Sequence, residues 1–442
     1  MMMQWQRLER SLRPLSLVLL AALIFIAAQG TGIELFFHLS YLLISIVVVA
    51  YLWAWLNLHG LSVRRETFSH RAQVGDVARE RVTLINHWFL PRLWVEVLDH
   101  SNLPSHSAGF VAYLPGNDQQ RWVVRTPCTM RGKFRLGPVT LASSDPLGLF
   151  RLQRDIAGAT DILVYPRTVP LPEFVLPGAE LPGGQSLRRR THHVTPNVAA
   201  LREYQPGDSF NRIHWRSTAR LGRLMVKEFE LDPTAEVHIL LDMNEHAQQA
   251  LRQAKAIPVA RDQRTAESTE EYAVHVAASV ARHVLDQNRA VGLIAWGQHR
   301  EVIPPEREVR QLYKILEALA ELRAYGATSL AEVLSAESAR FGRNCTLVVI
   351  TPSLDERWVT GVQHLLYRGV RIVAILIDAH TFGGGRSNQT IRMRLAGLRV
   401  PTYVYGRGQT LAAALARPAP GDQQHVDGMP RRDDLVRPHR AG

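Results

Sequence analysis

The chain has 442 residues, which is too many for one ordinary domain, so we expect two or three. Charged residues make up 21% of the sequence and hydrophobic residues 46%, and this balance argues against a mostly disordered protein. The two cysteines, Cys128 and Cys345, are far apart, which excludes a CxxC metal knuckle and disfavours a disulfide framework. The net charge of +12 is compatible with a nucleic-acid partner or an anionic membrane surface.

Two apolar stretches near the N-terminus predict a transmembrane helical hairpin over residues 14–58, after a cytoplasmic segment of residues 1–13. The second stretch, 35–58, is long enough to cross about 30 Å of hydrocarbon at about 1.5 Å per residue. Arginines flank the hairpin on its outer sides but are absent from its connector, which predicts two spans of the inner membrane with the main body in the cytoplasm. A cleaved signal peptide is the alternative for the first stretch, although the second apolar stretch follows at once.

Residues 60–166 predict a small β-sandwich-like domain. Short, partly alternating strands are expected at 78–86, 93–99, 120–125, 133–141 and 162–165, separated by turns rich in Gly, Pro, Asn and Asp. Pairs such as Val82/Leu84 and Val95/Val97 give each strand one apolar face, as in two packed antiparallel sheets. No catalytic constellation stands out in this region.

Residues 235–417 alternate between strands and helices. Strands are expected at 237–241, 291–296, 346–351, 371–377 and 402–405, with helices at 270–287, 308–322, 329–341 and 355–367. The strands are almost wholly apolar, as parallel strands covered on both faces must be. The predicted fold class is therefore α/β, with a doubly wound sheet in this domain. Residues 418–442 predict a disordered tail.

A basic segment lies between these two domains, within a region of residues 167–234 that begins as a Pro/Gly-rich linker. It reads LREYQPGDSFNRIHWRSTARLGRLMVKEFE from Leu201 to Glu230. We expect a helix over 210–221, capped by Asp208 or Ser209 and ended by a left-handed Gly222. Such a helix would place its arginines, spaced every four residues, on one face.

Arginine side chains bind carboxylates and phosphates through two parallel hydrogen bonds, so this segment is a candidate partner-binding or anion-binding surface. The alternative is that its arginines pair with acidic residues and helix ends inside the protein. The candidate residues are Arg202, Tyr204, Asp208, Arg212, His214, Trp215, Arg216, Arg220, Lys227 and Glu228.

The same segment resembles the signature of the domain of unknown function 58 family. The resemblance lies in Arg202-Glu203-Tyr204-x-x-Gly207-Asp208-x-x-Asn211-Arg212-Ile213-His214-Trp215 and in the run that ends Val226-Lys227-Glu228-Phe229-Glu230. It extends upstream to Arg131-Gly132, Leu136-Gly137-Pro138 and Asp145-Pro146-Leu147-Gly148-Leu149-Phe150, and it covers the chain to about residue 380. It implies a bacterial membrane-anchored protein with a von Willebrand factor A-like last domain and a MoxR-type AAA+ ATPase as partner.

The resemblance also implies where a metal ion would lie. A von Willebrand factor A domain holds Mg²⁺ at the carboxyl ends of its strands, and the matching positions here are Asp242, Asn244, Thr328 and Asp355. Asn244 and His246 replace two serines, and a histidine is a poor ligand for a hard cation. We therefore expect a degraded site and no cofactor, with Mg²⁺ as the one metal left open. The alternative is that Asp242 and Thr328 bond loop backbone and helix ends.

The chain has no GxxxxGK[ST] phosphate loop, no HExxH and no GxSxG elbow. We therefore expect a non-catalytic membrane-anchored adaptor or scaffold that binds protein partners. One alternative is a hydrolase that uses Asp208, His214 and the arginines on an anionic substrate. Nucleic-acid binding is disfavoured, because only Trp215 and Tyr204 offer aromatic rings near the arginines.

Overall fold

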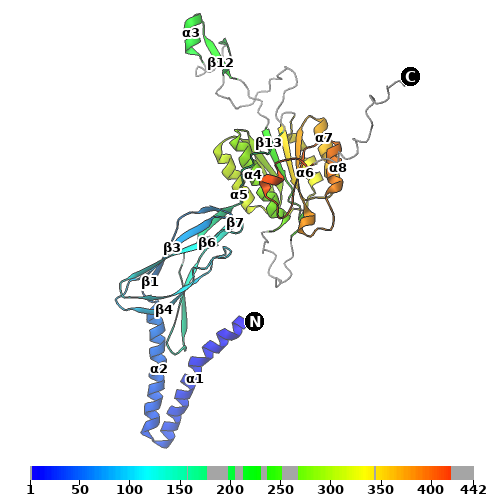
Figure 1. The fold of residues 1–442 in the computed structure, drawn as a ribbon. Coiled ribbons are helices and arrows are strands. Elements are labelled where there is room, and N and C mark those ends of the chain that lie inside the picture. Colours follow the sequence, from blue (N-terminus) through cyan, green and yellow to red (C-terminus); the bar gives the residue numbers. More distant parts are fainter. Residues whose placement is uncertain are drawn as a thin grey trace, which may run out of the picture. The chain divides into compact units, whose positions relative to one another are not determined.

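The computed structural model describes residues 2–156, 158–176, 198–204, 213–229, 236–250, 267–342 and 345–419 (Figure 1). It divides into two compact units, each described here by itself. The first comprises Met1–Arg167 together with Leu316–Glu321, and the second comprises Thr168–Ile315 and Leu322–Gly442. Most of the predicted disordered tail lies outside the described residues.

The first unit begins with two antiparallel helices, α1 (Met2–Thr31) and α2 (Glu34–Leu58). Both contain segments long and apolar enough to span a membrane, as the sequence predicted. Ala21 and Ala28 on α1 are buried, and such small side chains let two helices approach closely. The Ser40 hydroxyl on α2 donates a hydrogen bond to the Ala21 carbonyl on α1 (3.0 Å). The pair therefore packs as a hairpin.

Three sheets follow in this unit. The first has the order β1-β3-β6, formed by β1 (Leu61–Thr67), β3 (Val77–Asn86) and β6 (Gln119–Pro127). The second has the order β5-β4-β8-β9, formed by β5 (Phe110–Leu114), β4 (Arg92–Asp99), β8 (Val139–Ser144) and β9 (Arg151–Ile156). The third has the order β2-β10-β7, formed by β2 (Arg71–Gln73), β10 (Thr160–Tyr165) and β7 (Gly132–Leu136).

Apolar side chains of the first two sheets form one buried core, which includes Leu84 of β3, Val95 of β4 and Leu141 of β8. The expected strand over 133–141 is wrong, because β7 and β8 belong to different sheets and Gly137-Pro138 separates them. Proline has no N–H for a sheet ladder, so a strand interior cannot easily include it. Strands β1 and β9 were not predicted, because charged residues interrupt their alternation.

The end of α2 is built into the β-sheets. Leu58, its last residue, belongs to the same core as Leu84. The Asn57 amide on α2 donates to the Leu93 carbonyl (3.0 Å) and accepts from the Leu93 N–H (3.3 Å). The Arg92 guanidinium donates to the His59 carbonyl (3.0 Å). The helix and the sheets are therefore joined by side-chain packing and by hydrogen bonds as well as by the continuous backbone.

A cluster of four charged side chains lies inside this unit. Arg65 donates to Asp99 (2.7 Å) and approaches Glu80 (3.4 Å), while His106 Nε2 lies 2.6 Å from Asp99 and 3.3 Å from Glu80. Their side chains are at most 6% exposed. Burial alone would lower the pKa of His106, but its hydrogen bonds to Asp99 and Glu80 outweigh burial and raise that pKa to about 9. The cluster is thus neutral overall when His106 is protonated.

Asp99 shows the complementary shift. Burial alone would raise its pKa, but hydrogen bonds from His106, Arg65 and Ser101 outweigh burial and lower the pKa to about 2. A buried charge needs such partners because the protein interior solvates it poorly. The cluster therefore links β1, β3 and β4 through Arg65, Glu80 and Asp99 only while all of its charges are present.

The second unit contains a six-stranded sheet with the order β15-β14-β13-β16-β17-β18. Strands β13 (Glu236–Leu241), β14 (Val291–Trp296), β16 (Cys345–Thr351), β17 (Arg371–Ile377) and β18 (Thr402–Tyr405) are parallel, and β15 (Arg300–Glu306) is an antiparallel edge strand. From β13 the chain continues to β14 and β15 on one side of the sheet and later returns to β16, β17 and β18 on the other, so the strand order reverses between β13 and β16. In open α/β sheets, this reversal leaves a crevice at the carboxyl ends of the two strands.

Helices cover the sheet (Figure 1). They are α4 (Thr269–Asp286), α5 (Val309–Glu321), α6 (Leu330–Glu337), α7 (Arg357–Tyr367), α8 (Gln389–Gly397) and α9 (Leu411–Ala414). Leu240 of β13 and Val349 of β16 share a core with the apolar faces of α6, α7 and α8. The expected strands and helices are present with small shifts, and the helix expected at 355–367 begins at Arg357. The start of the predicted linker packs on α4, where Val169 N–H donates to Ser279 Oγ (3.1 Å).

We predict that replacing His106 with Gln destabilises the β-sheets of the first unit by about 3–5 kcal/mol at pH 7, because two buried carboxylates lose a cationic partner. Since the folded-state pKa of His106 lies above its ordinary value of 6.5, its stabilisation is complete below about pH 6.5 and is lost as the pH rises through about 9. Thermal unfolding of the full chain in detergent between pH 6 and pH 10 measures both effects.

The matched control is His70→Gln, since His70 is exposed in the same unit. The wild type and this control should lose stability as the pH approaches 9. The stability of His106→Gln should not show this pH dependence. An equal pH dependence in all three proteins would contradict the role given to His106.

Candidate functional site

The basic signature segment folds around a short hairpin. Strands β11 (Val198–Glu203) and β12 (Met225–Phe229) pair antiparallel, and α3 (Trp215–Leu221) lies between them in the sequence. Ile213 forms an isolated bridge with Val226, and both residues are buried. Gly222 ends α3 in the left-handed conformation (φ +65°), as predicted.

The expected helix over 210–221 is too long. The helix begins at Trp215, because the preceding Ile213 is held in the bridge to β12 and His214 occupies the cap position. The His214 side chain accepts a hydrogen bond from the Ser217 N–H (3.2 Å), and its Nδ1 lies 2.7 Å from Ser217 Oγ. His214 therefore caps the N-terminal end of the helix, the role that was expected of Asp208 or Ser209. Asp208 and Arg212 lie outside the described residues.

The remaining signature residues occupy two places. Trp215 is 66% exposed, and Arg216 and Arg220 are also exposed, four residues apart on one face of α3. Arg202 lies on β11 opposite Val226, and Lys227 and Glu228 lie on β12 opposite Leu201 and Ala200. Tyr204 follows β11, and its N–H donates to the Leu224 carbonyl (2.9 Å).

The arginines of α3 and of the residue that follows it make few ion pairs with the described residues. Arg223, just after the helix, lies 3.5 Å from Glu203 with both side chains exposed. Arg216 and Arg220 make no ion pair within the part of the chain that the structure describes. The described signature residues therefore form an open surface with two spare guanidinium groups beside an exposed indole, and His214, whose Nδ1 faces Ser217, is occupied in the helix cap.

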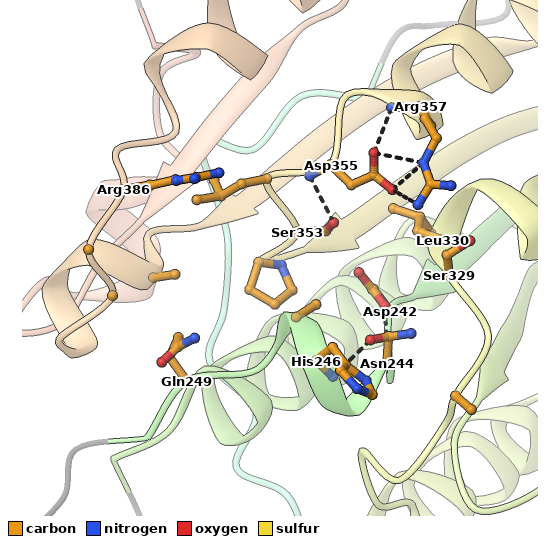
Figure 2. A pocket seen from close by; sticks show the side chains of 17 residues that line it. Asp242, Asn244, His246, Gln249, Ser329, Leu330, Ser353, Asp355, Arg357 and Arg386 are labelled. Carbon is orange, nitrogen blue, oxygen red and sulfur yellow. Dashed lines mark hydrogen bonds and ion pairs between the residues drawn. The ribbon is translucent and has the colours of Figure 1, made fainter.

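A second candidate site is a pocket of about 720 Å³ at the carboxyl ends of β13 and β16 (Figure 2). It lies where the strand order reverses in the sheet. Three loops line it: the loop after β13, the loop before α6 and the loop after β16, with a fourth contribution from Gly384, Gly385 and Arg386. The metal pattern in the sequence indicated the loops after β13, before α6 and after β16. Arg386 was not predicted, because it follows a run of glycines that indicates only a loop.

Asp242 is buried at the base of this pocket. The Thr351 hydroxyl donates to its Oδ2 (2.6 Å), and the Asn244 N–H donates to its Oδ1 (3.1 Å). Burial raises the pKa of Asp242 to about 6, although both hydrogen bonds act in the opposite direction. Oδ2 therefore joins the ends of β13 and β16, and Oδ1 holds the loop that follows β13.

The other predicted metal residues are also engaged. The Asn244 side-chain oxygen accepts from the His246 N–H (2.8 Å), and its amide donates to the Thr328 carbonyl (2.9 Å), as Figure 2 shows in part. Thr328 thus takes part in this network through its backbone carbonyl. The Asp355 carboxylate pairs with the Arg357 guanidinium (2.8 Å), and this hydrogen-bonded partner lowers the pKa of Asp355.

This donor set does not fit Mg²⁺, which requires several oxygen ligands in octahedral geometry. Asp242 and Asn244 use their oxygens on the loops, and Asp355 is neutralised by Arg357. Arg357 and Arg386 both line the pocket and are exposed. Two guanidinium groups favour an anion over a cation in this pocket.

We predict that Asp242→Ala destabilises the second unit by about 1–3 kcal/mol for each donor left unpaired, since the Thr351 hydroxyl and the Asn244 N–H lose their acceptor. Asp355→Ala is the matched control in the same pocket, and it should cost under about 1 kcal/mol because its pair with Arg357 is solvated. Thermal unfolding of the full chain measures both.

The same melts should be unchanged by millimolar Mg²⁺ or by a chelator. A midpoint that rises with Mg²⁺ in the wild type but not in Asp242→Ala would instead establish a metal site.

Comparisons with solved structures give only partial likenesses. A CARDB domain from Pyrococcus furiosus is 14% identical, with a TM-score of 0.18, over 24% of this chain and 91% of that chain. Proximal thread matrix protein 1 from the mussel byssus is 11% identical, with a TM-score of 0.24, over 33% of this chain and 38% of that chain. Such likenesses are too slight to bear on the fold or the function.

Sequence comparisons are more specific. The uncharacterized protein YeaD of Bacillus subtilis (strain 168) is 23% identical over 364 residues, which are 80% of this chain and 85% of that protein. Residues 200–380, which include α3 and most of the residues that line the pocket, match the family described as protein of unknown function DUF58.

Proposed function

We propose that the protein is a non-catalytic, membrane-anchored adaptor whose second unit binds protein partners. In this proposal α1 and α2 cross the inner membrane, and the arginines that flank them keep the main body in the cytoplasm. The second unit is a doubly wound domain of the von Willebrand factor A type. Its strand order and the crevice beside β13 and β16 support this assignment.

One observation carries the proposal: α3 presents Arg216 and Arg220 on one exposed face beside the 66% exposed Trp215. Neither arginine has an ion-pair partner among the described residues. Arginine and tryptophan are the side chains most enriched at the energetic centres of protein interfaces. Their joint exposure on one short helix supports a docking role.

The partner that fits this surface is an acidic protein surface, because each guanidinium group can bind a carboxylate through two hydrogen bonds. A MoxR-type AAA+ ATPase is the partner that the family resemblance implies, and we propose it as the partner here. The pocket offers a second contact, since Arg357 and Arg386 can receive a carboxylate of the same partner.

We predict that the double reversal Arg216→Glu/Arg220→Glu reduces capture of an AAA+ ATPase by at least about tenfold, because like charges then face the acidic partner and each factor of ten requires only about 1.4 kcal/mol. The experiment captures the full chain from gently solubilised membranes and quantifies all co-purified proteins by mass spectrometry.

The matched control is Arg121→Glu/Arg125→Glu, which reverses two exposed arginines at the same spacing on β6. It should capture the ATPase as the wild type does. Failure of the wild type to recover any ATPase would contradict the proposed partner, and equal capture by both double variants would contradict the role of α3.

A further inference from the structure

One turn of the first unit lies alongside α2. The turn Asp145–Phe150 joins β8 to β9, and the ring of Phe150 meets the ring of Tyr51 on α2 edge to face, with centroids 5.5 Å apart. Strands β8 and β9 also contact α2. Tyr51 precedes Leu58, the last residue of α2, by seven positions, or about 10 Å along the helix axis. The turn therefore extends back beside the apolar helix, past its C-terminal end (Figure 1).

The turn displays apolar side chains at its tip. Leu147 is 63% exposed, and Leu149 and Phe150 are half-buried. Pro146 is exposed and has no N–H group to satisfy. An exposed leucine at the tip of a turn has no stabilising role in water, but it does where the tip meets hydrocarbon.

The backbone of the turn is satisfied from within. The buried carboxylate of Asp145, only 4% exposed as a residue, accepts from the Leu147 N–H (2.9 Å) and from the Phe150 N–H (2.6 Å). The Gly148 N–H donates to the Asp145 carbonyl (3.1 Å). Unpaired N–H groups are costly in hydrocarbon, so a turn that enters a bilayer must bond them internally. This turn meets that requirement at these three positions.

Exposed aromatic side chains lie near the last turn of α2. Trp94 is 61% exposed and has a positive φ of 51°, at a bulge where the pairing of β4 with β5 shifts. Its neighbour Leu93 is the residue that bonds Asn57 of α2 through both of its backbone groups. A positive φ is unfavourable for tryptophan, and such outliers persist where their geometry serves a purpose. The bulge turns Trp94 outward beside the end of the helix.

A row of rings begins at the end of α2 and leads to a second exposed aromatic side chain, Phe89. The ring of Trp55 lies 4.6 Å from His59, His59 lies 5.7 Å from Trp88, and Trp88 stacks on Phe89 at 6.1 Å. Phe89, at the end of this row, is 72% exposed. Aromatic residues of this kind concentrate at membrane–water interfaces, where their rings lie at the level of the headgroups. The row therefore extends the interfacial end of α2 onto the β-sheets.

We propose that the first unit is seated in the lipid bilayer, with the Asp145–Phe150 turn inserted beside α2 and with Trp94 and Phe89 at the headgroup level. This inference rests on the proposed membrane crossing of α2. Its occupant is the bilayer, because the exposed apolar side chains are continuous with the lipid-facing helix and are fixed to it by Asn57 and Tyr51.

The test measures the depth of Leu147 in the full chain, reconstituted in phospholipid nanodiscs. Leu147→Cys carries an environment-sensitive fluorophore, and lipids with a spin label on the acyl chain act as quenchers. The two native cysteines are buried, and burial raises the pKa of each thiol, so the wild type treated in the same way serves as the blank.

Two further sites calibrate the measurement, each equally exposed at 51%. Val48→Cys lies on α2, and Val77→Cys lies on β3, nine residues from Asn86, or about 30 Å along an extended strand. Asn86 pairs with Leu61, just after α2, so Val77 is at the end of β3 away from the helix. We expect labels at 147 and 48 to be quenched at least about threefold more than the label at 77.

The controls separate the two proposals. If the label at 147 behaves like the label at 77 while the label at 48 is quenched, the membrane crossing stands and the seating of the turn is overturned. If the label at 48 also escapes quenching, the membrane crossing itself is overturned, and the seating of the turn with it.

Discussion

A polar or charged group that is taken out of water must find a partner, and this constraint organises most of what the protein contains. In the first unit Arg65, Glu80, Asp99 and His106 neutralise one another inside the β-sheets. In the second unit Asp242 is buried, and its oxygens bond Thr351 and Asn244. These buried charges therefore hold neighbouring strands and loops together.

The exposed charges, in contrast, do not need partners within the protein. Arg216 and Arg220 are exposed and have no ion-pair partner among the described residues, so each guanidinium group can bind an external carboxylate. Around the pocket, Arg357 is already shared with Asp355, while Arg386 stands on a separate loop. This division supports the proposed binding of a protein partner, since the exposed arginines can form new bonds whereas the buried charges are engaged.

The sequence predicted the regular parts of the fold well, because burial alone dictates them. Strands β16, β17 and β18 are apolar runs between turn signals, and α4 and α7 carry apolar faces at helical spacing. The errors have physical reasons. Gly137-Pro138 separates two sheets that one apolar run seemed to join, and the bridge between Ile213 and Val226 shortens α3, which helical spacing alone could not show. The charged cluster of the first unit was also missed, because Arg65, Glu80, Asp99 and His106 are scattered in the sequence.

The candidate sites could be predicted to different degrees, depending on whether the residues that form them are close together in the sequence. The signature arginines are close in sequence, so their grouping was visible, although the true helix cap is His214. Asp242 was placed correctly at the end of its strand, but the strand partner that uses its carboxylate, Thr351, is over a hundred residues away. The turn Asp145–Phe150 was noticed only as a family motif. The proposed role of the turn depends on two contacts that the sequence does not reveal, that of Phe150 with Tyr51 and those of the Asp145 carboxylate with the turn's own N–H groups. Because Asp145 satisfies these N–H groups, an acidic residue here makes the apolar tip compatible with lipid.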